Sequence, residues 1–152
     1  MIYTIIPIEN SHIKPLAALE KQCFTSPWSV ESIAEQLDNP LAHFLVAVAG
    51  SAVAGYIGTQ EIAGECYITN IAVSPEYRRS GIAQALLTAA QEGARARGCS
   101  FITLEVRVSN LPAIALYSKN GFAVAGERRD FYTKPDENAY IMTKYFDKGA
   151  AP

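Results

Sequence analysis

The most constraining feature of the sequence is an amphipathic segment that ends at Gly98. Its opposite face is polar, and its apolar positions recur every four residues with one leucine beside them, at Ile82, Leu86, Leu87, Ala90 and Ala94. This period predicts a helix that buries one stripe. A meander of three strand-like segments comes directly before the helix, and further strands alternate with another helix after it. We therefore expect a mixed sheet with helices on both faces.

Strand and helix signals divide the rest of the chain. Gly50-Ser51 joins two β-branched, apolar segments as a hairpin. Ser29 is a good N-cap for a helix that Pro40 terminates. We expect strands over residues 2–8, 44–48, 52–60, 65–73, 101–106, 122–125 and 140–146, helices over 13–22, 30–38, 82–98 and 112–119, and a turn-rich stretch over 133–138.

Composition limits the classes of protein to which the chain can belong. A length of 152 residues with 49% hydrophobic residues suits one compact domain with a sizeable core. We expect that domain to span residues 1–146 and a frayed tail to follow over 147–152. The 13 basic and 15 acidic residues leave a formal net charge of −2, which argues against a nucleic-acid partner held by a broad basic face.

The cysteines and histidines argue against a metal centre. Cys23, Cys66 and Cys99 lack the spacing of zinc ligands or redox pairs, and we expect small buried residues in a reducing compartment. His12 and His43, the only histidines, have no partner at ligand or triad spacing. Because the apolar runs are too short to cross a bilayer and the first residues do not resemble a signal peptide, we expect a cytoplasmic protein with no membrane partner.

Residues 71–83 combine a strand, a turn with two arginines and a helix that begins at a glycine. The first turn of a helix can bind a phosphate through its unpaired backbone N–H groups and the positive end of its dipole. Gly81 and Ala83 leave the backbone accessible to a pyrophosphate, and Arg78 or Arg79 could pair with a further phosphate. The segment matches neither the Walker nor the Rossmann pattern, and alone it also fits an ordinary strand-to-helix connection.

A second motif follows the first along the chain. Arg-x-x-Gly-x-Ala spans residues 78–83, and Asn-x-x-Ala-x-x-Leu-Tyr-x-x-x-Gly-Phe spans residues 110–122. Together they resemble the GNAT family of acetyl-CoA-dependent N-acetyltransferases, over about residues 44–146. The resemblance implies an α/β (α+β) fold of the GNAT type. Its central sheet would be mixed and mostly antiparallel, with six to seven strands, helices on both faces and a splayed central strand pair.

Three local segments narrow the resemblance. They are Phe-Thr-Ser-Pro-Trp-Ser over residues 24–29, Leu-Glu-Val-Arg-Val-Ser-Asn over 104–110 and Arg-Arg-Asp-Phe-Tyr over 128–132. All three are similar to segments of RimI-type enzymes, which acetylate the N-terminal alanine of a small-subunit ribosomal protein. Phe131 stands where a tyrosine is more usual, and Asn138 where an aspartate is. The resemblance implies acetyl-CoA as cosubstrate and a protein N-terminus as acceptor, and we expect a monomer or weak dimer.

The resemblance also implies residue roles. Glu105 would be the base, acting directly or through water, and Tyr117 the acid that protonates the leaving sulfur. The reference pKa values are about 10 for tyrosine and about 8.5 for a thiol. Because they are close, the free-energy change of this proton transfer is small. The Val73 N–H would stabilise the oxyanion. Trp28 and Tyr132 could each line the peptide groove or simply pack in the fold. The residues expected at acetyl-CoA are Ile71, Ala72, Val73, Arg78, Arg79, Ser80, Gly81, Ile82, Ala83, Gln84 and Asn110.

Plainer alternatives remain open for these roles. Glu105 could face solvent on an alternating strand, and Tyr117 could be a core residue at helical spacing. The acceptor could be a small-molecule amine or a lysine side chain. The protein could also be a non-catalytic acyl-CoA-binding sensor, although pure binding requires neither Glu105 nor Tyr117.

Overall fold

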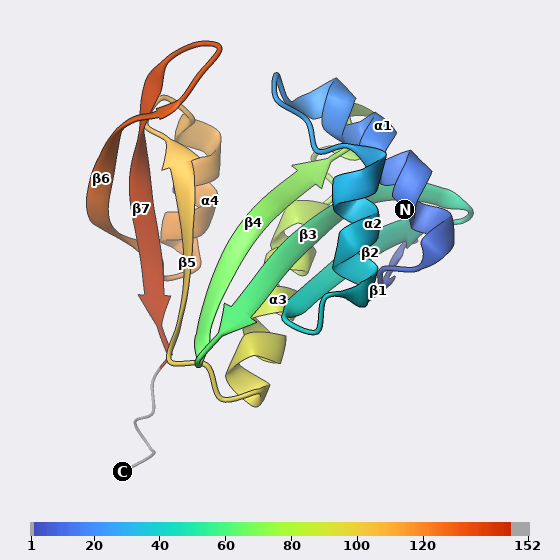
Figure 1. Cartoon of the computed structure of the whole chain (residues 1–152), viewed down its shortest axis with the longest axis horizontal. Helices are drawn as coiled ribbons and strands as arrows, with labels where there is room; N and C mark the ends of the chain where they lie inside the picture. Colours follow the sequence, from blue (N-terminus) through green and yellow to red (C-terminus); the bar gives the residue numbers. More distant parts are fainter. Residues whose placement is uncertain (1, 147–152) are drawn as a thin grey trace.

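The computed structural model describes residues 2–146, so the predicted tail over 147–152 lies outside the described residues. Within residues 2–146 the chain forms seven strands and four α-helices (Figure 1). It runs through β1 (Thr4–Pro7), α1 (Ile13–Cys23), α2 (Val30–Asp38), β2 (Ala42–Ala49), β3 (Ala52–Ile62), β4 (Glu65–Val73), α3 (Ile82–Ala96), β5 (Phe101–Arg107), α4 (Leu111–Lys119), β6 (Ala123–Tyr132) and β7 (Glu137–Tyr145).

The strands of this region form one sheet in the order β1-β2-β3-β4-β5-β7-β6. Neighbouring strands are antiparallel except β4 and β5, which run parallel. The expected mixed, mostly antiparallel sheet is therefore confirmed.

The parallel pair β4 and β5 separates soon after it forms. It pairs only at Glu65 with Phe101, Cys66 with Ile102 and Tyr67 with Thr103. Just beyond, the register between β3 and β4 skips Thr69, which is the extra residue of a bulge. A bulge bends and twists its strand, so it turns β4 away from β5. Figure 1 shows the two strands diverging, as the resemblance predicts. Their facing edges are therefore unpaired beyond the first three residues.

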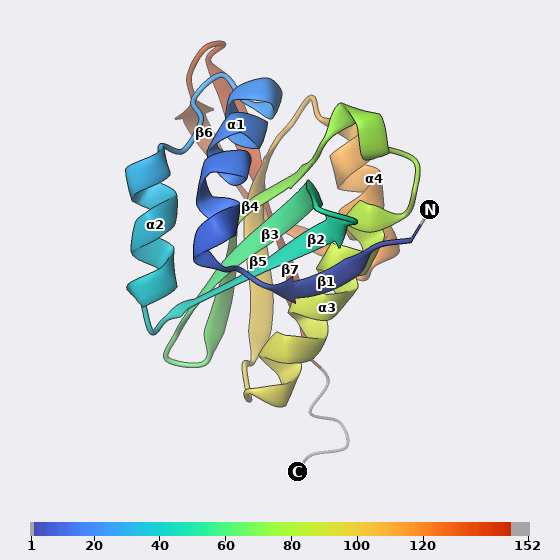
Figure 2. The same ribbon diagram turned by 90° about the vertical axis from the view of Figure 1, so that its right-hand side faces the viewer.

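Helices cover both faces of the sheet (Figure 2). One core lies between α1, α2 and strands β2–β4, and includes Leu16, Ile33, Phe44, Val46, Tyr56 and Ala72. The other lies under α3 and α4, and includes Ile57, Leu86, Leu87, Ile102, Leu104 and Met142. No helix in residues 2–146 has the length and apolar character that a bilayer crossing requires.

The last hairpin differs from the prediction. β6 continues to Tyr132 instead of ending at residue 125, and β7 begins at Glu137 instead of residue 140. Because β6 is an edge strand with mostly exposed residues and an interrupted register, its sequence carries little alternation to detect. The turn is correspondingly shorter than the expected 133–138. All other predicted boundaries agree with the structure within two residues.

Candidate active site

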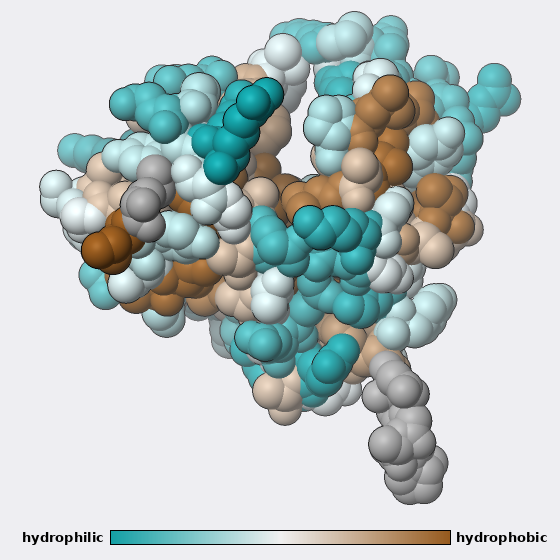
Figure 3. All heavy atoms as spheres, turned by 180° about the vertical axis from the view of Figure 1, so that it is seen from behind, coloured by the Kyte–Doolittle hydropathy of each residue, from teal (hydrophilic) through white to brown (hydrophobic). Residues whose placement is uncertain are grey.

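A cleft of about 570 Å³ lies where β4 and β5 separate. β4 and β5 line its sides, and the segment between α1 and α2 and the turn between β6 and β7 line its outer end. Figure 3 shows the opening between the two halves of the molecule from behind, with apolar atoms at its margins. Of the residues predicted to be functional, the cleft is lined by Trp28, Ile71, Glu105, Asn110, Tyr117 and Tyr132.

The backbone of β4 faces the cleft at alternate residues. The Ser74 N–H donates to the Ala54 carbonyl on β3 at 2.8 Å. Because successive residues of a strand direct their backbone groups to opposite edges, Ala72 faces β3 as Ser74 does, whereas Ile71 and Val73 face the gap. Ala72 pairs with Tyr56 on β3 and its side chain is buried in the core under α1, so the backbone groups that remain for a cofactor at this edge are those of Ile71 and Val73.

The N-terminus of α3 is open to a ligand. Its N-cap, Gly81, has a φ of 78° and supplies no capping side chain. Arg79 also has a positive φ, of 65°, and half-buried Ser80 lies between them. A Cβ at Gly81 would have no other atom within 4 Å. The first backbone N–H groups of α3, at residues 82–84, have no acceptor within the helix, so this end fits a pyrophosphate.

Two predicted cofactor residues use their side chains elsewhere. The Arg78 Nε donates to the Val73 carbonyl at 3.2 Å, so Arg78 braces the end of β4. Gln84 and Asn120 exchange amide hydrogen bonds of 2.7 and 2.9 Å. Only the backbone N–H of Gln84 therefore remains for a phosphate. Arg79 is exposed and has no side-chain partner in residues 2–146, which makes it the arginine available to a further phosphate.

Glu105 projects from β5 into the cleft. Alternate β5 residues are buried in the core under α3 and α4, and Glu105 belongs to the opposite, half-exposed face. Its Oε2 lies 3.3 Å from the Arg128 Nε, and its Oε1 has no partner within residues 2–146. A carboxylate in this position can accept a proton from a molecule bound in the cleft.

Tyr117 reaches the same cleft from α4. Asn110 begins that helix, where its Oδ1 accepts the Ala113 N–H at 3.3 Å. Tyr117 is only 5% exposed. Burial, with a smaller contribution from Tyr132, raises the pKa of Tyr117 to about 12. The phenol is thus a weaker acid than the sequence analysis assumed, but it stays protonated throughout the physiological pH range.

Glu20 is a cleft residue that the sequence analysis missed. It is 1% exposed on α1, where its Oε1 accepts the Trp28 N–H at 2.9 Å and its Oε2 accepts the Tyr56 hydroxyl at 2.6 Å. Burial and this carboxylate raise the pKa of Tyr56. Glu20 thereby ties the segment that carries Trp28 to the sheet. The sequence does hold a signal that could have identified Glu20, because this charged residue lies on the apolar stripe of α1, four residues after Leu16.

The sequence analysis also did not predict that Arg107 and Cys23 line the cleft. Arg107 follows Glu105 by two positions on the same face of β5, and its guanidinium carbon lies 4.4 Å from the centroid of the Tyr132 ring. Cys23, expected to be buried, is half-buried because it is the last residue of α1 and faces the gap. Its Sγ lies 3.8 Å from the Val73 carbonyl.

The cleft combines a carboxylate, a buried phenol, an open strand edge and an anion-binding helix start. Within the described residues, no group of three or more His, Cys, Asp or Glu side chains could hold a metal ion. The arrangement suits an elongated cofactor whose phosphates lie at α3 and whose reactive end lies between Glu105 and Tyr117. The family model described as the acetyltransferase (GNAT) family matches residues 13–122.

The chain belongs to the GNAT family. Like other GNAT acetyltransferases, it is an acetyl-CoA-dependent N-acetyltransferase. It is 35% identical over 141 residues to the ribosomal protein bS18-alanine N-acetyltransferase of Escherichia coli K12, with 91% of this chain and 95% of that protein covered. It is 42% identical over 125 residues to a Bacillus subtilis strain 168 protein provisionally named for the same activity, with 82% and 83% covered.

A solved GNAT structure supports the fold. The crystal structure of the ribosomal-protein-S18-alanine N-acetyltransferase from Escherichia coli matches with a TM-score of 0.88 and 32% identity. The match covers 95% of this chain and 94% of that one. The splayed strands, the α3 N-terminus and the cleft therefore belong to a GNAT fold that spans nearly the whole described chain.

Proposed function

We propose that this GNAT enzyme acetylates the α-amino group of a protein N-terminus, and that its acceptor is the N-terminal alanine of a small-subunit ribosomal protein. The observation that carries the proposal is the 35% identity, over nearly the full length, to an enzyme named for that reaction. The cleft is consistent with it, because its outer end is lined by two chain segments, residues 23–28 and 131–135, between which a peptide can enter.

In the proposed mechanism, Glu105 prepares the acceptor for attack. An α-amino group has a reference pKa of about 7.7 to 8.0, so near pH 7 most of it carries a proton that must be removed. Glu105 accepts this proton, directly or through a water molecule. The neutral nitrogen then attacks the thioester carbonyl and forms a C–N bond. The Val73 N–H, which faces the gap, donates to the oxygen on which negative charge develops.

Tyr117 completes the transfer at the sulfur. As the C–S bond breaks, the phenol donates its hydrogen bond, and finally its proton, to the leaving thiolate. The acetylated nitrogen releases its second proton to solvent, and the phenol regains a proton from solvent. A pKa of about 12 makes full transfer to a thiolate unfavourable at equilibrium, since the reference thiol pKa is about 8.5. Tyr117 therefore contributes mainly as a hydroxyl that stays protonated and donates a hydrogen bond to the sulfur. The amine attacks directly, without an acyl-enzyme.

The proposed acceptor is tested with matched peptides. One peptide begins with a free alanine and carries an internal lysine, and its control is identical except for an acetylated N-terminus. We expect the enzyme to add one acetyl group to the first peptide, on the α-amino nitrogen, and none to the control, as measured by fragment mass spectrometry.

Acetylation of the lysine in either peptide would favour the lysine alternative. Turnover of small amines with neither peptide modified would favour the small-molecule alternative. Thioester cleavage at background with every amine and peptide would indicate a non-catalytic sensor.

A further inference from the structure

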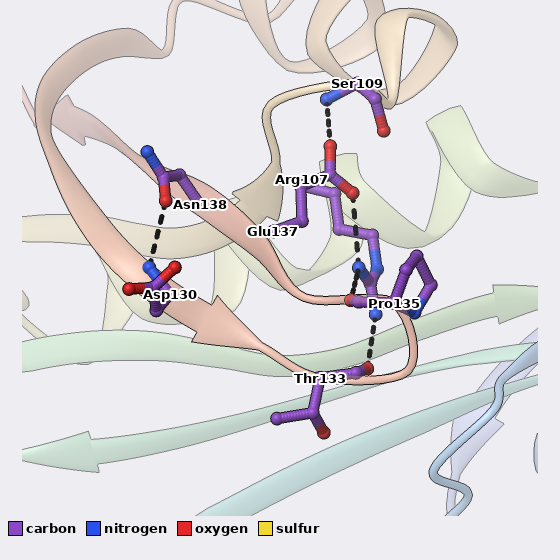
Figure 4. A network of polar contacts seen from close by, with 7 residues as sticks. All are labelled: Arg107, Ser109, Asp130, Thr133, Pro135, Glu137 and Asn138. Carbon is purple, nitrogen blue, oxygen red and sulfur yellow. Dashed lines mark hydrogen bonds and ion pairs between the residues drawn. The ribbon is translucent and has the colours of Figure 1, made fainter.

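Arg107 and Glu137 join β5 to the turn between β6 and β7 (Figure 4). The two terminal nitrogens of Arg107 donate to three acceptors, which are the Thr133 carbonyl at 3.0 Å, the Pro135 carbonyl at 2.9 Å and the Glu137 Oε1 at 3.2 Å. The other oxygen of Glu137 accepts the Ser109 N–H at 2.8 Å. We call Arg107 and Glu137 together the clasp.

Few other contacts hold the turn. Nearby, the Asn138 Oδ1 accepts the Asp130 N–H at 2.9 Å and the Asn138 Nδ2 donates to the Glu127 Oε2 at 2.8 Å, but neither bond involves residues 133–136 (Figure 4). Residues 133–136 are all exposed, so apolar burial contributes little to holding them. The β6–β7 register is also interrupted between Arg128 and Tyr132. A planar guanidinium that binds two carbonyls and a carboxylate at once fixes both position and orientation. The clasp is therefore the principal set of contacts that sets the place of this turn.

The clasp also reaches the reactive part of the cleft. Arg107 stacks on the ring of Tyr132, which lines the cleft immediately before the turn. Through Ser109, Glu137 contacts the residue before Asn110, where α4 begins, and α4 carries Tyr117. The Ser109 hydrogen bonds, together with the Arg107 guanidinium, hold the pKa of Glu137 below its ordinary value, so its carboxylate stays charged at neutral pH.

We propose that Arg107 and Glu137 are positioning residues for the acceptor: the clasp holds the 133–136 turn and Tyr132 as one wall of the acceptor entrance. This inference rests on the proposed function, because it assigns the wall to a peptide. Most residues expected at the cofactor lie elsewhere, at the edge of β4 and the start of α3; Asn110, next to Ser109, is near the clasp, but the Arg107 side chain donates to the turn and to Glu137 instead. Loosening the clasp therefore weakens acceptor binding and leaves acetyl-CoA binding intact.

The central variant is Arg107→Lys, which keeps the charge but loses the planar fork. We expect the KM for the alanine peptide to rise about tenfold, because charge-assisted hydrogen bonds are lost. We expect kcat and the acetyl-CoA dissociation constant to stay within about threefold. Glu137→Gln, which can still accept the Ser109 N–H, should raise this KM by a smaller factor.

Arg95→Lys is the matched control. Arg95 also lies over an aromatic ring, 5.2 Å from the Phe146 centroid, but it belongs to the last turn of α3 and does not line the cleft. It should leave the KM for the peptide unchanged. A double variant of Arg107→Lys with Tyr132→Phe should raise KM by less than the product of the two single effects, because both act on one wall.

Amide hydrogen exchange tests the clasp independently of the acceptor. In Arg107→Lys, exchange over residues 130–137 should accelerate while exchange in β3 stays unchanged. Unchanged exchange in that segment would overturn the clasp. Faster exchange together with an unchanged KM for the peptide would show that the clasp has only a structural role, and would overturn the positioning proposal. If wild type acetylated no peptide, the proposed function would fail and the positioning role with it, while exchange would still report whether the clasp exists.

Discussion

Glu105→Gln is expected to lower kcat for the alanine peptide by about 10²- to 10⁴-fold, the usual contribution of a positioned general base. Glutamine keeps the shape of the side chain but cannot take the proton that the ammonium group must lose. Acetyl-CoA should bind as in wild type, because we propose that β4 and α3 hold the cofactor. Steady-state kinetics and titration calorimetry measure the two quantities separately.

The control for this variant is Glu92→Gln, the same change on the exposed face of α3. It should leave both kcat and cofactor affinity unchanged. Full activity of Glu105→Gln would remove Glu105 from the mechanism. Raising the pH should partly restore the rate of the variant, because a larger share of the amine is then neutral without a base.

Tyr117→Phe is expected to lower kcat by about 10²-fold, comparable with the loss of one hydrogen-bond donor to a developing negative charge. The ring still packs against Phe122, so the fold and acetyl-CoA binding should persist.

Since burial raises the pKa of Tyr117 to about 12, ionisation of this residue should cause no loss of wild-type kcat up to about pH 10. Initial rates over a pH series test this statement and the lower kcat of the variant.

Tyr145→Phe provides the matched control, because Tyr145 is 72% exposed and lies outside the cleft. It should behave as wild type. A Tyr117→Phe variant with full kcat would show that the departing thiolate needs no donor from this residue. A wild-type rate that fell with an apparent pKa well below 12 would require another group to titrate.

The sequence predicted the elements that have strong periodicity. The stripe of α3 and the alternation of β4 and β5 reflect one buried face each, and burial is what periodicity records. β6 was predicted too short because its residues are exposed on an edge and its course depends on β7. The bulge at Thr69 was also invisible, since it follows from pairing with β3 and not from the residue itself.

The residues predicted from motifs include two that line the same cleft in the structure. Glu105 and Tyr117 lie on different elements, yet the structure brings both to one cleft. The sequence analysis missed side-chain roles that depend on tertiary neighbours. Glu20, which accepts the Trp28 N–H, and Arg107, which donates to carbonyls of the turn, are two examples. Gln84 illustrates the reverse case, because Asn120, distant in the sequence, takes up the side chain that a local pattern had assigned to the cofactor.

The central claim is that the opened strands and the start of α3 hold acetyl-CoA with its thioester between Glu105 and Tyr117. It is tested most directly by a crystal structure with a conjugate in which coenzyme A is joined through an acetyl group to the N-terminus of an alanine peptide. We predict the pyrophosphate at residues 79–84, the linking sulfur beside the Tyr117 hydroxyl and the α-nitrogen on the Glu105 side. A conjugate bound with its sulfur and nitrogen away from both side chains would contradict the account.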